Sequence, residues 1–201
     1  MFYEVAQGHG LKHDPFKAIV TPRPIGWITA MSARGDINLS PYSFFNAVSD
    51  RPPMVAFSSD GQKDAVTFIE ETGEFVCNLA TYDLREPMNL TSAPLARGES
   101  EMTHAGLEAA PSRLVRPPRV KASPAALECR YVQTVPLAGR DGRGQYRLVI
   151  GEVIGVHIDD RFLEDGLLDT AAMRPIARAG YRDYFVSTPE TRFSITRPKG
   201  G

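Results

Sequence analysis

Three short runs of β-forming residues lie within the stretch from residue 21 to residue 64, and this crowding restricts the possible folds more than any other feature. The runs cover residues 25–32, 37–39 and 54–58. Gly35 lies between the first two and can supply the positive φ that a tight reversal needs. Two prolines precede the third run, where the start of a strand tolerates them. The stretch therefore predicts strands joined by short turns.

The segment between the second and third runs mixes aromatic rings with small hydroxyl and amide side chains. It contains Tyr42, Phe44 and Phe45 among Ser40, Ser43, Asn46 and Ser49. Such a non-helical segment can line a pocket for a flat ring with polar edges. The competing interpretation is a hairpin with ordinary connecting loops, and composition alone favours that interpretation.

A strand, a short Ser/Gly loop and a helix follow one another up to Gly73. Apolar residues recur at helical spacing over residues 65–72, and Gly73 suits the end of a helix. Free N–H groups and the helix dipole attract an anion at such a helix start. Lys63 adds a point charge there, and hydroxyl groups are carried by Ser58, Ser59 and Thr67. The pattern suits a phosphate seat, and the alternative is a solvated helix start with Asp64 in its first turn.

Other patterns place the remaining elements. β-like runs cover residues 16–20, 74–80, 125–135 and 146–158, and helix-like patches lie within residues 82–97 and 159–174. Gly151 and Gly155 would permit bends and close approaches in the longest run. Residues 138–144 contain three glycines but precede no helix, so they form a hairpin loop and not a dinucleotide-binding fingerprint. Many short strands with frequent turns predict a mainly β, closed or split Greek-key barrel with a few short helices.

Charge and composition exclude several classes of function. The 201-residue chain has a net charge of −1, which argues against bulk electrostatic capture of nucleic acid or an anionic membrane. No apolar run reaches the length of a membrane span, and no secretory leader is evident, so we expect a cytoplasmic protein. Cys77 and Cys129 lie in β-like runs and are expected to be buried thiols. His9 and His13 lack the partners that a metal site needs, so no metal is expected.

A local basic cluster interrupts the loop-rich segment of residues 98–124. It consists of Arg113, Arg116, Arg119 and Lys121. The cluster could attract the phosphates of a nicotinamide nucleotide. A solvated basic loop is the favoured interpretation.

Several motifs, taken in order, are similar to those of one known family. They are R-P-I-G-W-I-T-A at 23–30, N-L-S-P-Y-S-F-F-N at 38–46, P-P-M-V-A-F-S-S at 52–59, K-D at 63–64, G-E-F-V-C-N-L at 73–79, L-E-C-R at 127–130, L-V-I-G-E-V at 148–153 and P-I-A-R-A-G-Y-R-D-Y at 175–184. Each motif is short, but their order and spacing together are specific. Over about residues 10–185 the chain resembles the flavin reductase-like family of FMN-binding split barrels.

The resemblance implies one split-barrel domain over residues 1–201, usually assembled as a homodimer with flavin sites near the interface. It also implies an NAD(P)H-dependent FMN reductase, in which a hydride passes from nicotinamide C4 to flavin N5 and the flavin carries the chemistry. The protein would hold the two rings in contact and stabilise charge, without a dedicated acid or base. No strictly catalytic residue is therefore expected. The final electron acceptor stays open, and a monooxygenase component is one candidate partner.

The resemblance assigns the flavin contacts residue by residue. The ring and ribityl chain would meet Trp27, Ile28, Thr29, Ala30, Ser43, Phe44, Phe45 and Asn46. The phosphate end would be formed by Ser58, Ser59, Lys63, Asp64 and Thr67, with Asp64 orienting the loop. Arg178 and Tyr184 would close the site from the same chain or from a partner subunit.

Two alternatives use the same pocket. The chain could bind flavin without reductase turnover, as a carrier or electron-transfer protein. It could also belong to the pyridoxamine-phosphate-oxidase-like branch of the barrel and oxidise another substrate with FMN. The K-D helix start and the late P-I-A-R-A-G-Y segment favour the flavin reductase branch.

Overall fold

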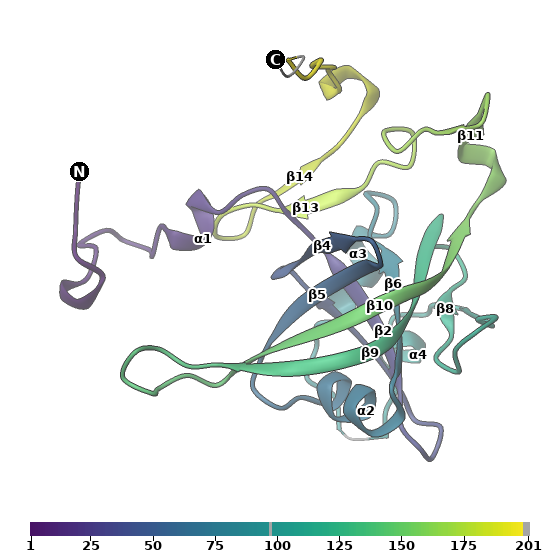
Figure 1. Ribbon diagram of the computed structural model, residues 1–201, viewed down its shortest axis with the longest axis horizontal. Helices are drawn as coiled ribbons and strands as arrows, with labels where there is room; N and C mark the ends of the chain where they lie inside the picture. Colours follow the sequence, from purple (N-terminus) through teal and green to yellow (C-terminus); the bar gives the residue numbers. More distant parts are fainter. Residues whose placement is uncertain (97, 199–201) are drawn as a thin grey trace.

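A seven-stranded antiparallel sheet dominates the computed structural model, which describes residues 1–96 and 98–198. The strands run in the order β3-β2-β6-β9-β10-β5-β4 (Figure 1). Their bounds are β2 Gly26–Met31, β3 Ile37–Tyr42, β4 Phe45–Asp50, β5 Pro53–Asp60, β6 Glu74–Leu79, β9 Ala125–Leu137 and β10 Tyr146–Ile158. The expected mainly β architecture is confirmed.

The two edges of this sheet must lie close together, because β3 and β4 are the edge strands and only residues 43 and 44 connect them. Contacts across the edges show the closure. The rings of Tyr42 on β3 and Phe57 on β5 have centroids 4.6 Å apart. The ring of Phe45 on β4 packs against the backbone of β2, where a Cβ on Gly26 would lie 2.6 Å from it. The sheet is thus curled into an open barrel, and residues 43–44 mark its seam.

A smaller sheet and several short helices surround the barrel. The small sheet has the order β1-β13-β14, with bounds Arg23–Pro24, Ile176–Arg178 and Tyr184–Val186. The helices are α1 Phe16–Ile19, α2 Asp64–Thr72, α3 Arg85–Leu90 and α4 Glu101–His104. Single turns of 3₁₀ helix cover Val5–Gln7, Asp160–Phe162 and Pro189–Thr191. Two short strand pairs complete the fold. They are β7 Ala109–Ala110 with β8 Arg119–Val120, and β11 Leu163–Glu164 with β12 Leu167–Leu168. The N-terminal residues extend away from the barrel as an arm that ends beside α1 (Figure 1).

The core lies on both faces of β2, as the period of a strand requires. Ile28 and Ala30 belong to the cluster inside the barrel, together with Phe57 and Phe75. Trp27 belongs to a second cluster, which packs under α3. Trp27 and Ile28 therefore face opposite sides of β2.

Several predicted elements agree with the structure. The run at residues 146–158 coincides with β10, and α2 ends at Gly73, whose φ of 75° is left-handed. The pairing of β10 with β9 shifts register next to Gly151 and Gly155. The thiols of Cys77 and Cys129 are free and buried.

Two local predictions were wrong. The run at residues 16–20 forms helix α1, because a Pro-initiated turn with Asp14 accepting the Phe16 N–H starts a helix there. Residues 45–50 form the edge strand β4, which pairs with β5, in agreement with the hairpin interpretation of this non-helical segment. The helix-like patch at 159–174 forms a 3₁₀ turn and a two-stranded hairpin, since Gly166 adopts a positive φ in the turn between β11 and β12.

Among the residues that the structure describes, no helix is long and apolar enough to cross a membrane.

The close approach of β10 to Phe75 predicts the effect of one substitution. A Cβ at Gly151 would lie 2.3 Å from the Phe75 ring, so Gly151→Ala should lower the free energy of unfolding by about 1–3 kcal/mol through overpacking. Gly155→Ala in the same strand is the matched control, because its nearest contact would be the flexible Leu114 side chain at 3.3 Å. Urea denaturation of both variants measures the difference. Equal stability of the two would contradict the packing argument.

Candidate functional site

A groove with two connected pockets runs along the seam of the barrel. The seam pocket has a volume of about 530 Å³, and the central pocket beside it about 630 Å³. Both are lined by Lys17, Pro41, Ser43 and Ser92, so they form one continuous depression. The groove follows from the fold, because the two-residue connection between β3 and β4 leaves a break in the wall of the barrel.

The structure brings many of the predicted site residues to this groove. The seam pocket is lined by Ser43, Phe44, Ser58, Lys63 and Asp64, and the central pocket by Ser43, Arg178 and Tyr184. These residues are far apart in the sequence. Their convergence is the main geometric observation about the site.

Other predicted residues lie outside the groove lining. Trp27, Ile28, Thr29 and Ala30 are fully buried, and β2 is paired on both sides, with β3 and with β6. Their side chains are buried on the two faces of β2 and the strand is paired within the sheet, so their contact with a ring stays a prediction.

The remaining predicted residues surround the seam without lining either pocket. Phe45 packs against the barrel core, Asn46 is exposed on β4, and Thr67 is half-buried on α2. Ser59 is buried, and its hydroxyl has no hydrogen-bond partner among the described residues.

The start of α2 forms one end of the seam pocket. Lys63 occupies the N-cap with an extended backbone, and no side chain caps the helix. The first helical hydrogen bond runs from Thr67 N to Lys63 O at 3.0 Å. The N–H groups of residues 65 and 66 precede this bond and can donate to an anion. Lys63 is exposed beside them and adds a positive charge.

One wall of the seam pocket is a segment that the sequence did not assign to the site. Residues 91–95 follow α3 and line the pocket. Trp27 Nε1 donates to Thr91 Oγ1 at 2.9 Å, and Thr91 Oγ1 donates to Met88 O at 2.7 Å. The buried indole of Trp27 therefore holds this wall in place. A buried indole N–H needs a hydrogen-bond acceptor, and this was the only signal in the sequence. It does not identify which residue accepts.

The floor of the seam pocket contains a buried carboxyl group that the sequence analysis also missed. Glu101 on α4 accepts hydrogen bonds from Asn38 Nδ2 at 2.8 Å and from Leu39 N at 3.0 Å. Burial raises the pKa of Glu101, and the charge of Asp64 adds to this, although the hydrogen bonds oppose it. These bonds join α4 to β3, so they fix the floor against the edge of the sheet.

A tyrosine hydroxyl on the same floor is available to a ligand. Tyr42 is buried, lines the seam pocket, and its Oη has no hydrogen-bond partner within the described part of the chain. Burial raises the pKa of Tyr42 to about 12, and the carboxyl groups of Glu101 and Asp64 add to this, although the hydroxyls of Ser59 and Ser40 oppose it. The hydroxyl therefore keeps its proton. A protonated hydroxyl on the pocket wall can donate to a ligand that offers an acceptor atom.

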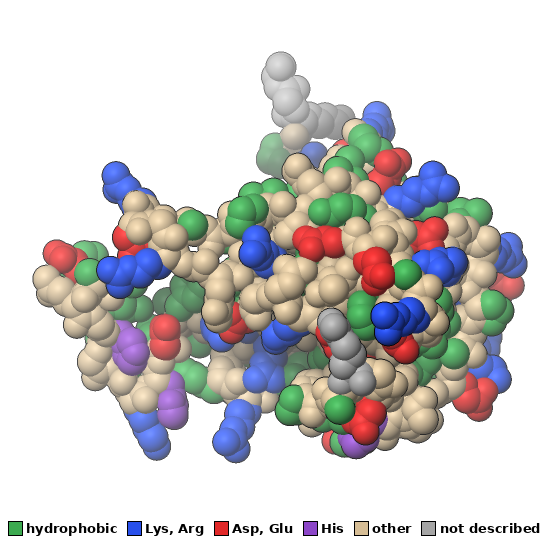
Figure 2. All heavy atoms as spheres, turned by 90° about the horizontal axis from the view of Figure 1, so that it is seen from below, with side chains coloured by type: hydrophobic (Ala, Val, Ile, Leu, Met, Phe, Trp, Pro, Cys, Tyr) green, Lys and Arg blue, Asp and Glu red, His purple; other side chains and the backbone are tan. Residues whose placement is uncertain are grey.

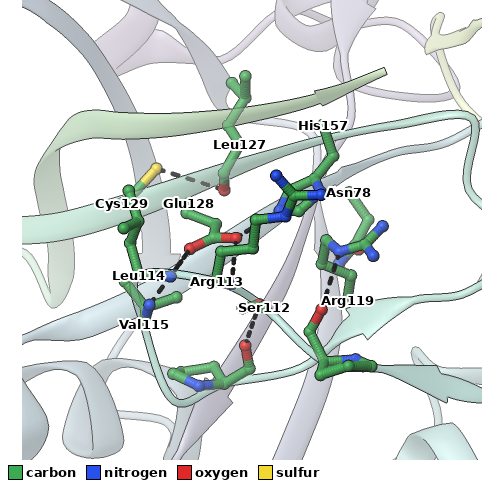
Figure 3. Close-up of polar contacts among 12 residues, drawn as sticks. Asn78, Ser112, Arg113, Leu114, Val115, Arg119, Leu127, Glu128, Cys129 and His157 are labelled. Carbon is green, nitrogen blue, oxygen red and sulfur yellow. Dashed lines mark hydrogen bonds and ion pairs between the residues drawn. The ribbon is translucent and has the colours of Figure 1, made fainter. Parts of the chain in front are cut away.

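A second polar cluster lies away from the groove (Figure 3). Glu128 on β9 is fully buried and accepts from the backbone N–H groups of Arg113, Leu114 and Val115 at 2.7, 2.6 and 3.2 Å. Its other close partner is His157 Nε2 on β10. Burial alone would raise the pKa of Glu128, but the hydrogen bonds from His157 and the backbone outweigh it and lower the pKa. The carboxylate is fully engaged, so its role is to fasten the loop at 113–115 to the sheet.

The basic cluster of the sequence does not face the groove. Arg116 pairs with Glu74 at 3.7 Å, and Lys121 pairs with Glu108 at 2.5 Å. None of its four side chains lines the seam pocket or the central pocket. This placement agrees with a solvated basic loop.

Comparisons with known proteins agree with the fold. Residues 19–176 match the model of the flavin reductase like domain. A protein of Deinococcus radiodurans is 39% identical over 186 residues, which cover 87% of this chain and 79% of that protein.

Two solved structures are similar over nearly the whole chain. Nitrilotriacetate monooxygenase component B from Bacillus cereus is 27% identical with a TM-score of 0.87, covering 97% of this chain and 98% of that one. A flavin reductase-type protein with a split barrel domain from Shewanella frigidimarina is 22% identical with a TM-score of 0.82, covering 98% and 100%. The split-barrel prediction is confirmed.

The buried carboxylate of Glu128 predicts a pH-dependent contribution to stability. Glu128→Gln should lower the free energy of unfolding by about 2–4 kcal/mol near neutral pH, because an amide leaves backbone donors unsatisfied. The folded pKa is below the ordinary value of 4.5, so this contribution is present above that value and is lost as the pH falls through the folded pKa. Urea denaturation at several pH values should show the deficit of the variant shrinking in acid.

The control is Glu108→Gln, which breaks an exposed ion pair and should change stability little. A deficit of Glu128→Gln that stayed constant as the pH fell would contradict a role for the ionised carboxylate.

Proposed function

The chain belongs to the flavin reductase-like family, and we propose that it binds FMN in the seam groove and reduces it with NAD(P)H. The observation that carries the proposal is the convergence of Ser43, Phe44, Ser58 and Lys63 on one pocket at an uncapped helix start. This combination suits a flat ring at one end and a phosphate at the other.

The residues that line the groove fit FMN. Lys63, Ser58 and the N–H groups of residues 65 and 66 would hold the phosphate, with Asp64 orienting the loop. The ring of Phe44, which lies 5.9 Å from that of Tyr146, gives an aromatic wall. The protonated Tyr42 hydroxyl would supply a hydrogen-bond donor for an acceptor atom of the ligand.

The residues of the chain bind and orient, and the chemistry belongs to the cofactor. Bound flavin would supply the hydride acceptor for a nicotinamide donor. Arg178 and Tyr184 would close the groove over the ring and place positive charge near it. The wall at 91–95 would exclude water from one side. Since the transfer needs no acid or base, we assign no strictly catalytic residue.

The assembly proposed is a cytoplasmic homodimer. Support for a dimer comes from the N-terminal arm, where Met1, Phe2 and Val5 expose about nine-tenths of their surface. Such an exposed apolar segment is typical of an interface. A monooxygenase is proposed as the recipient of the reduced flavin, because the similar Bacillus cereus protein is a monooxygenase component.

An anaerobic titration tests the proposed activity. The purified protein with FMN should show oxidised flavin bands in the visible spectrum, and NADH or NADPH should bleach them. Bands that stay oxidised with both nucleotides would identify a flavin carrier or a protein with another reductant. A protein that binds no added FMN would contradict the flavin assignment altogether.

The phosphate seat predicts the effect of removing one charge. Lys63→Ala should weaken FMN binding by about 1–3 kcal/mol, the scale of a charge-assisted hydrogen bond. Fluorescence quenching of FMN on titration with protein measures the affinity. Lys121→Ala, which removes the same charge from a loop outside the groove, should leave the affinity unchanged. Equal affinities of the two variants would mean that the phosphate lies elsewhere.

A further inference from the structure

Two arginines face each other across a pair of strands in the central pocket. Arg23 on β1 and Arg178 on β13 are direct partners in the antiparallel register. Both line the central pocket, together with Lys17. Like charges directly opposite each other destabilise a sheet, so the pair needs compensation from another source.

Within residues 1–96 and 98–198, no ion pair is formed by the guanidinium of Arg23. Its side chain donates to the carbonyl oxygens of Lys17, Val20 and Ala179, the last at 3.0 Å. Arg23 is only 6% exposed, and its Nε has no partner among the described residues. Burial lowers the pKa of Arg23, and the charge of Arg178 lowers it further. Backbone dipoles therefore hold this buried charge, which no carboxylate of the described residues neutralises.

Arg178 is held in a fixed orientation beside it. One Nη donates to Tyr181 O at 2.6 Å, and the guanidinium lies 4.5 Å from the centre of the Tyr184 ring. No ion pair to Arg178 is formed in the described part of the chain. A planar guanidinium placed in this way can bind a phosphate or carboxylate through two parallel hydrogen bonds.

The charges on the pocket wall favour an anion. Within residues 1–96 and 98–198, the wall carries the cations Lys17, Arg23 and Arg178 and a single acid, Asp14. One oxygen of Asp14 already accepts the Phe16 N–H at 2.9 Å. Figure 2 shows Lys and Arg side chains gathered around a hollow between the body of the molecule and the protruding N-terminal part.

The two ends of the groove differ in this respect. The seam pocket is lined by Asp60, Asp64 and Glu101 as well as by Lys17 and Lys63. The central pocket has an excess of positive charge, whereas the seam pocket does not. A second anionic group in the groove would therefore lie at the arginine pair and not beside Lys63.

We propose that Arg23, Arg178 and Lys17 form an anion subsite for the molecule that exchanges hydride with the flavin, distinct from the phosphate seat at Lys63. This inference rests on the proposed function. The chemistry recognised is a phosphate or carboxylate attached to a planar body that lies against the Tyr184 ring. The phosphate would come from a nicotinamide nucleotide, and the carboxylate from an organic acid that accepts electrons.

Calorimetric titration of the FMN-loaded protein separates the two sources. The probes are NADP⁺ for the phosphate and benzoate for the carboxylate, with benzamide as the neutral counterpart of benzoate. Binding of NADP⁺ alone would identify the nucleotide as the source, and binding of benzoate but not benzamide would identify the carboxylate. Binding of neither anion would overturn the proposal.

Three variants locate the binding. Arg178→Gln should lower the affinity for the anion at least tenfold. Arg178→Lys keeps the charge but not the planar guanidinium, so it should recover part of the lost affinity. Arg143→Gln removes the same charge from an exposed hairpin loop and should have no effect. Equal losses in Arg178→Gln and Arg143→Gln would overturn the proposal. The melting temperature of each variant checks that it is folded.

Two further outcomes separate this inference from the proposed function. If NAD(P)H does not bleach the flavin but an anion binds through Arg178, the reductase assignment fails and the subsite stands. In the other outcome, NAD(P)H bleaches the flavin, but Arg178→Gln weakens FMN binding as much as Lys63→Ala does and leaves the affinities for NADP⁺ and benzoate unchanged. The arginine pair would then bind the FMN phosphate, and the proposed subsite would be overturned.

Discussion

The short connection between β3 and β4 is the constraint on which the rest of the structure depends. These strands form opposite edges of a seven-stranded sheet, yet they are consecutive in the chain, so the sheet has to curl until its edges meet. Tyr42, Phe57 and Phe45 fill the closing contact, and Gly26 leaves room for it. The same closure leaves a break in the barrel wall at residues 43–44. The groove is therefore a product of the topology, and the side chains around it determine only what it can bind.

The groove is completed by segments that are not part of the barrel. The strand pair β1–β13 brings two arginines to one side, and the segment after α3 supplies the other wall. The segment after α3 is tied to the core by the hydrogen bond from Trp27 to Thr91, and α4 is tied to β3 by the bond from Leu39 N to Glu101. Buried hydrogen bonds of this kind are costly to break, so they give short, irregular segments a defined position. The site thus combines a rigid barrel edge with walls that depend on a few specific bonds.

Strand periodicity and motif order predicted the barrel and the position of α2, because these follow from local patterns. They failed where tertiary contacts decide. The run at 16–20 has a strand-like composition but forms a helix, and the helix-like patch at 159–174 follows a glycine turn into a hairpin. Glu101 and residues 91–95 could not be assigned to the site, because nothing in their own sequence shows that they return to β3. Arg23 was visible within a motif, but its opposition to Arg178 depends on a pairing across more than 150 residues.

The hydrogen bond between Trp27 and Thr91 has an optical consequence. The chain has a single tryptophan, so all of its indole emission comes from one buried ring. That ring is joined directly to the segment that walls the groove, and the emission of an indole depends on the polarity and hydrogen bonding around its N–H. The protein therefore carries its own fluorescent reporter, whose signal records the position of the groove wall without any attached label.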